Sequence, residues 1–193
     1  MNPYVIPLTR LKYDRDACIE LFDSLDFSVR WDDRPSGKYI RAKNPDNLFE
    51  IPCIKEIHEQ IPWVKNFQLI KIQKNWEMPI HVDTYRTAVL MIPLSDSPAP
   101  TFWFDEPEHI KELRLSEDRD AYIKASKELN LEPIYTHVQD GTPCVINSTI
   151  PHNTNTYNGI DRLTIQISMA SLLNGPYHDW NKVTQLLQQR QLL

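Results

Sequence analysis

Hydrophobic and polar residues change their spacing along the chain near Asn66. Before that point, residues 14–25 carry apolar side chains at helical spacing, which predicts an amphipathic helix. Residues 52–60 predict a second, short helix that begins at its proline. The stretch between them, residues 30–46, is rich in Arg, Asp and Pro and is expected to form a loop. Residues 1–65 are therefore predicted to be a helical N-terminal support.

From Asn66 onward, short apolar runs and alternating patterns predict strands. The clearest strand is residues 161–170, in which one face is apolar and the other is polar; the polar face carries Arg162, Thr164, Gln166 and Ser168. Further strands are expected at residues 67–73, 87–94, 101–104, 134–138 and 143–147. Turns at Asp140-Gly141 and Asn158-Gly159 join neighbouring strands, so the arrangement is expected to be antiparallel.

Two helical segments interrupt or follow the strands. Residues 116–129 predict a helix capped by Ser116, within an insert at about residues 105–132. The tail, residues 171–193, is expected to end in a helix. The predicted fold is thus mainly β with flanking helices, a two-sheet jelly roll whose core spans residues 66–170. A length of 193 residues fits one domain.

Composition excludes some classes of function. The net charge of -5 gives no basic surface for nucleic acid. No apolar run approaches the roughly 18 residues of a membrane span, and the N-terminus lacks the pattern of a signal peptide. The three cysteines, Cys18, Cys53 and Cys144, are far apart and are expected to be buried thiols. These features favour a cytoplasmic protein without a membrane or nucleic-acid partner, and they leave its oligomeric state open.

Three residues have the chemistry of a metal site. His81 and Asp83 are two positions apart, so at the end of a strand both side chains would point to the same side. His152 follows a later strand and could supply a third ligand. Two histidines and one carboxylate fill one face of an octahedron and leave three positions open. Each feature alone is also explained by a surface pair or a structural histidine, and His137, which ends another strand, is a rival to His152.

Arg162 lies ten residues after His152 and opens the clearest strand. A guanidinium binds a carboxylate through two parallel hydrogen bonds, and Thr164 on the same face could add a hydroxyl donor. The polar face of this strand has two explanations. It is either exposed to solvent, or it lines an interior that holds a polar ligand.

In this order and spacing, the residues resemble the iron(II)- and 2-oxoglutarate-dependent oxygenases. The segment from His81 to Leu94 is similar to the aspartyl/asparaginyl β-hydroxylase-like and bacterial proline-hydroxylase-like branch. The resemblance implies a double-stranded β-helix, with Fe(II) on His81, Asp83 and His152. It also implies that 2-oxoglutarate binds to Arg162 and Thr164 and that O2 is consumed.

The resemblance further implies hydroxylation of an amino acid, a peptide side chain or another small molecule. Arg86, three residues after Asp83, is a candidate for binding a carboxylate of the substrate or for helping to bind 2-oxoglutarate, with a surface ion pair as the alternative. Two other functions stay open. A cupin-like metal-binding protein without oxygenase activity would have the same fold, and it would bind metal but not 2-oxoglutarate. A nucleic-acid demethylase of the same superfamily fits the acidic composition poorly.

Overall fold

The computed structural model describes residues 2–25, 39–42, 44–64, 66–78, 80–83, 86–105, 131–157, 159–171 and 180–193. Within these residues the protein is mainly β, and its strands form two antiparallel sheets. The larger sheet has the order β1 (Val5–Pro7), β7 (Cys144–Asn147), β4 (Arg86–Pro93), β9 (Arg162–Ser171), β3 (Phe67–Ile72) and β2 (Tyr39–Arg41). The smaller sheet has the order β6 (Tyr135–Val138), β5 (Pro100–Trp103) and β8 (His152–Thr154).

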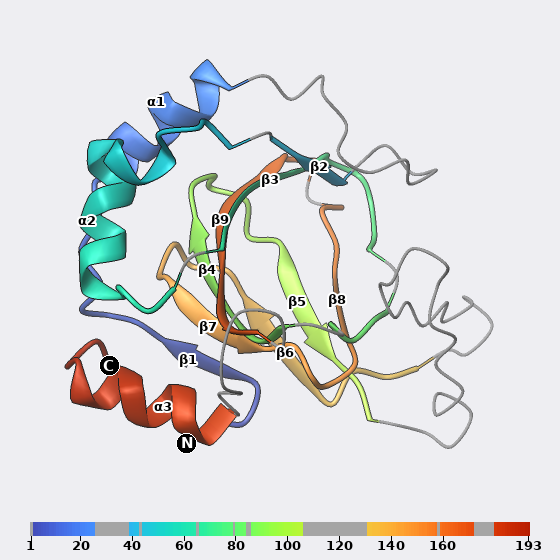
Figure 1. The fold of residues 1–193 in the computed structure, drawn as a ribbon. Helices are drawn as coiled ribbons and strands as arrows, with labels where there is room; N and C mark the ends of the chain where they lie inside the picture. The colour runs from blue at the N-terminus through green and yellow to red at the C-terminus, as the bar shows by residue number, and fades with distance from the viewer. Residues whose placement is uncertain are drawn as a thin grey trace.

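The larger sheet is the middle layer of the described structure. Helices α1 (Arg15–Ser24), α2 (Pro52–Gln60) and α3 (Trp180–Gln189) lie on one side of it, and strands β5 and β8 lie on the other (Figure 1). The helix-side core joins buried residues of the helices to the apolar faces of β3, β4 and β9. A smaller apolar cluster, centred on the fully buried Trp103, joins the two sheets. The polar side chains between the sheets are therefore shielded from solvent by apolar neighbours.

The predicted helices at residues 14–25 and 52–60 and the predicted C-terminal helix are confirmed. The side chain of Asp14 accepts a hydrogen bond from the Ala17 amide at 3.0 Å and caps α1. A 3-10 turn at Leu48–Glu50 precedes α2, which begins at its proline. All three cysteines are free and buried, as expected. No helix among the described residues is long and apolar enough to cross a membrane.

Three short strands differ from the expectation. Strand β2 lies inside the predicted loop at residues 30–46, and β1 lies in the predicted helical support at residues 1–65, where no strand was expected. Strand β8, at His152, was not predicted as a strand. Each has only three residues, which is too few to show alternation, and each pairs along the edge of a longer strand. The predicted helix at residues 116–129 and Asn158 of the second turn lie outside the described residues.

Candidate functional site

His81 and His152 face each other across an isolated pair of backbone hydrogen bonds. Each amide donates to the carbonyl of the other residue at 2.9 Å, and the two ring centroids are 4.4 Å apart. His152 is the first residue of β8, whereas His81 lies outside the strands, so the expectation that it ends a strand was wrong. This pairing, and not a strand end, brings two distant histidines together. Both are buried.

Asp83 is held beside the two histidines by the segment that follows β7. Its amide donates to the carbonyl of Ser148 at 3.0 Å, and the Ser148 hydroxyl donates to the carbonyl of Arg86 at 2.6 Å. The Asp83 carboxylate lies 3.9 Å from Nε2 of His81. Ser148 therefore fixes both ends of the short segment that carries Asp83.

The Arg86 guanidinium forms an ion pair with Asp83 inside the site. Its Nη2 lies 3.0 Å from each carboxylate oxygen of Asp83. Its Nη1 donates to the side-chain oxygens of Gln68 and Gln166, each at 3.3 Å. The sequence leaves both a ligand contact and a surface ion pair open for Arg86. The structure has a partly buried ion pair with a proposed metal ligand.

The charges around Asp83 and His152 favour the protonation states that bind a metal. Burial alone would raise the pKa of the Asp83 carboxyl, but the positive charge of Arg86, helped by His81 and His152, lowers it. Burial lowers the pKa of His152, against the opposing effect of Asp83. Nδ1 of His152 lies 2.9 Å from the Ile150 carbonyl, which can only accept, so the ring proton is on Nδ1. Nε2 of His152 is then the nitrogen with a lone pair for a metal.

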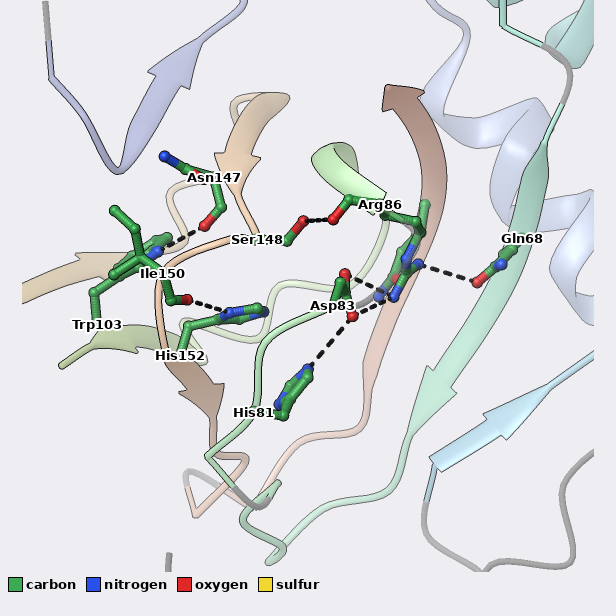
Figure 2. A network of polar contacts seen from close by, with 10 residues as sticks. Gln68, His81, Asp83, Arg86, Trp103, Asn147, Ser148, Ile150 and His152 are labelled. Carbon is green, nitrogen blue, oxygen red and sulfur yellow. Dashed lines mark hydrogen bonds and ion pairs between the residues drawn. The ribbon is translucent and has the colours of Figure 1, made fainter. Parts of the chain in front are cut away.

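One cavity contains all of the predicted site residues except Thr164. His81, Asp83, Arg86, His152, Arg162 and Gln166 are among the residues that line it. The two imidazole rings and the Asp83 carboxylate point toward one another, with Arg86 on the far side of Asp83 (Figure 2). In the part of the chain that the structure describes, no three His, Cys, Asp or Glu side chains lie close enough together to hold a metal ion as they stand. Neighbouring ligands of an octahedral ion with bonds of about 2.1 Å are about 3 Å apart, so the distance between His81 and Asp83 is longer by about 1 Å.

The polar face of β9 is buried between the two sheets. Arg162, Thr164, Gln166 and Ser168 are each at most 7% exposed. The explanation that this face is exposed to solvent is therefore wrong. Within the described residues, the buried hydroxyls of Thr164 and Ser168 have no hydrogen-bond partner. Buried polar groups are normally satisfied, so this face is suited to a polar ligand.

Two residues that the sequence did not single out contact Arg162. Its Nη1 donates to the hydroxyl of Thr154, and its Nη2 donates to the side-chain oxygen of Gln139 at 3.1 Å. Thr154 belongs to strand β8 of the smaller sheet, and Gln139 directly follows strand β6 of the same sheet. Neither is charged and neither belongs to a recognisable motif, so no sequence signal distinguished them from other polar residues.

His137, the rival of His152, lies on the Arg162 side of the smaller sheet. It pairs with Thr101 of β5, and Thr101 in turn pairs with Thr154 of β8. Burial and the positive charge of Arg162 lower the pKa of His137, although Asp140 opposes them. The backbone bridge joins His81 to His152, whereas His137 pairs with Thr101.

We expect the ion pair of Arg86 to stabilise the metal-free protein in a pH-dependent way. Arg86→Gln should lower the free energy of unfolding by about 2 kcal/mol at neutral pH. The folded pKa of Asp83 is lowered, so this contribution is fully present above the unfolded value of about 3.9 and is lost as the pH falls through the folded value. In the variant, burial raises the pKa of Asp83. The difference between the two proteins should therefore shrink as the pH falls.

Urea unfolding in the presence of a chelator, between about pH 7 and pH 4, measures this difference. Lys55→Gln is the matched control, because Lys55 lies 3.9 Å from Glu59 in an exposed pair. Its effect should stay below about 0.5 kcal/mol. A destabilisation by Arg86→Gln that does not change with pH would show that the ion pair with Asp83 is not its cause.

Comparison with known proteins gives a likeness in structure only. No protein family model and no curated protein matches the sequence. The epimerase SnoN of nogalamycin biosynthesis, in complex with Fe³⁺, α-ketoglutarate and nogalamycin RO, is 11% identical with a TM-score of 0.50; the match covers 86% of this chain and 78% of that one. HygX from Streptomyces hygroscopicus, with nickel, 2-oxoglutarate and hygromycin B bound, is 12% identical with a TM-score of 0.47, covering 84% and 80%. The α-ketoglutarate-dependent carbocyclase SnoK is 13% identical with a TM-score of 0.47, covering 86% and 77%.

At these identities the likeness concerns the fold alone. The match to SnoN supports the expectation of a mainly β, cupin-like fold.

Proposed function

We propose that this protein is an iron(II)- and 2-oxoglutarate-dependent oxygenase. His81, Asp83 and His152 would hold the metal, and Arg162 with Thr164 would bind the distal carboxylate of 2-oxoglutarate. The observation that carries the proposal is the shared cavity, which is lined by the two facing histidines, Asp83 and the buried Arg162. The fold shared with SnoN is consistent with a double-stranded β-helix built from the two sheets.

The donor set fits a non-haem iron centre. Two imidazole nitrogens and one carboxylate oxygen form a facial arrangement that leaves positions for a cosubstrate and O2. Bound iron(II) would supply the oxidising chemistry, in which 2-oxoglutarate and O2 give succinate and carbon dioxide while a second substrate is oxidised. Metal binding would need a shift of about 1 Å to close the gap between His81 and Asp83.

The chain's own residues orient and protect this centre. The Ile150 carbonyl fixes the tautomer of His152, and the Trp103 ring lies 6.5 Å from the His152 ring at an interplanar angle of 29°. Arg86 keeps Asp83 ionised, as a ligand must be. Arg162, only 3% exposed, would bind a carboxylate away from water, where a charged hydrogen bond is strongest.

The second substrate is proposed only by class. We expect an amino acid, a peptide side chain or another small molecule, because the cavity lies between the two sheets and the acidic chain offers no basic surface for nucleic acid. SnoN was crystallised with a small-molecule natural product, which is compatible with this class. Hydroxylation, and the β-hydroxylase-like or proline-hydroxylase-like branch, remain predictions from the sequence.

Succinate formation tests the proposal. Purified protein with iron(II), 2-oxoglutarate and air should release succinate above a control in which the metal is chelated, and candidate amino acids should raise the rate. Ni²⁺ in place of iron allows binding of 2-oxoglutarate to be measured without turnover. Metal binding without any affinity for 2-oxoglutarate would favour the cupin-like alternative, and the absence of both would exclude an oxygenase.

We expect the Thr164 hydroxyl to lower the stability of the ligand-free protein and to strengthen the binding of 2-oxoglutarate. Its hydroxyl is fully buried and has no partner among the described residues, so Thr164→Val should raise the free energy of unfolding of the ligand-free protein by about 1 kcal/mol. The same change should weaken binding of 2-oxoglutarate by about 10-fold, through loss of one hydrogen bond to a carboxylate. Urea unfolding and calorimetry on the Ni²⁺-loaded protein measure the two effects.

Thr156 provides the matched control for this change. It is also fully buried, but its hydroxyl lies 2.6 Å from the Gln73 carbonyl, to which it donates, and it accepts from the Trp76 amide. Thr156→Val should therefore destabilise the protein by about 1–3 kcal/mol. Equal destabilisation by the two valine variants would contradict the idea that Thr164 is kept for a ligand.

A further inference from the structure

Arg162 connects the two sheets through both ends of its guanidinium. The residue belongs to β9 of the larger sheet, whereas its two hydrogen-bond acceptors, Thr154 and Gln139, belong to or follow strands of the smaller sheet. All three side chains are buried. An acceptor at Nη1 and another at Nη2 fix the plane of the guanidinium as well as its position.

Each acceptor is itself held by the backbone. The Thr154 hydroxyl donates to the carbonyl of Pro100 at 2.7 Å, which leaves its oxygen to accept from Arg162. The Gln139 amide nitrogen lies 3.4 Å from the Thr142 carbonyl, so its oxygen is directed toward Arg162. The turn that carries Thr142 is closed by a bond of 2.9 Å from its amide to Asp140, and Gly141 adopts the positive φ of 91° that this turn requires.

We propose that Thr154 and Gln139 are positioning residues that orient Arg162 toward the metal side of the cavity and thereby select 2-oxo acids with a second carboxylate. This inference rests on the proposed function. Both acceptors are neutral, so they hold the guanidinium without cancelling the charge that a ligand carboxylate needs. Thr154 and Arg162 also line the same cavity as His81 and His152, so a ligand that spans the cavity would reach both ends.

Calorimetry on the Ni²⁺-loaded protein tests the inference with two probes. 2-Oxoglutarate would bind both the metal and Arg162. Oxalate binds the metal through its two carboxylates and has no further carboxylate that could reach Arg162. Thr154→Val and Gln139→Leu should each raise the Kd for 2-oxoglutarate by about 10-fold and leave the Kd for oxalate unchanged. Gln139→Glu should raise the Kd for 2-oxoglutarate by about 100-fold, because the new carboxylate pairs with Arg162 and competes with the ligand.

Thr154→Ser is the conservative control, since it keeps the hydroxyl and should bind 2-oxoglutarate within about 3-fold of the wild type. If Arg162→Leu loses 2-oxoglutarate but Thr154→Val and Gln139→Leu bind it normally, the positioning role is wrong and the proposed function stands. If the variants also bind oxalate or Ni²⁺ more weakly, the substitutions disturb the fold in general, and the inference also fails. If the wild type binds no 2-oxoglutarate, the proposed function itself fails.

Discussion

Asp83→Ala is expected to lower the affinity for Fe(II) by more than about 100-fold and to abolish succinate formation at ordinary metal concentrations. A structural zinc site with four ligands contributes about 10–16 kcal/mol to metal binding, so one ligand accounts for about 3 kcal/mol. The loss should be larger than this average suggests. Asp83 is the one negative charge of the proposed set, and its removal leaves the positive Arg86 facing the metal.

The experiment compares the Fe(II) affinity and the rate of succinate formation of Asp83→Ala with those of a variant at another acidic residue. Asp96 forms an exposed ion pair with Arg15 at 2.7 Å, and Asp96→Ala should leave both quantities unchanged. His152→Ala should behave like Asp83→Ala, while His137→Ala should retain the metal. Unfolding of each metal-free variant separates loss of the site from loss of the fold. Full activity of Asp83→Ala would exclude the proposed triad.

The sequence predicted the alternation of β9 but not where its polar face points. A face exposed to solvent and a face lining a polar cavity have the same pattern, so periodicity cannot distinguish them. The polar face of β9 is buried because the smaller sheet covers it. The sequence does not predict this cover, because strand β8 of the smaller sheet is too short to be recognised. The apolar face of β9 was predictable, because it packs against the helices whose own periodicity was clear.

The candidate metal residues were found through a resemblance and not through local structure. Neither His81 nor His152 has a pattern that predicts their mutual backbone bridge, because pairing between distant segments is a property of the whole sheet arrangement. Arg162 stood out as the one charge on the polar face of its predicted strand. Its partners Thr154 and Gln139 did not, because uncharged polar residues near turns are common and their role depends on a contact between the two sheets.

Arg162→Leu is expected to weaken binding of 2-oxoglutarate by about 100-fold or more, with the affinity for Ni²⁺ unchanged. Removing one partner of a buried, hydrogen-bonded charge pair costs about 2–5 kcal/mol, and Arg162 is only 3% exposed. Arg162→Lys should lose about 10-fold, because it keeps the charge but not the planar pair of donors. Calorimetry on the Ni²⁺-loaded variants measures the effect, and the KM for 2-oxoglutarate should rise in parallel.

This prediction separates the oxygenase from the cupin-like alternative, which Asp83→Ala does not, since both functions need the metal. In a metal-binding protein without oxygenase activity, Arg162 would serve only to join the two sheets through Thr154 and Gln139. Arg162→Leu would then lower the free energy of unfolding without changing any ligand affinity. Because the oxygenase predicts a loss of 2-oxoglutarate affinity that exceeds the change in oxalate affinity, the ratio of the two affinities distinguishes these roles even when the variant is less stable.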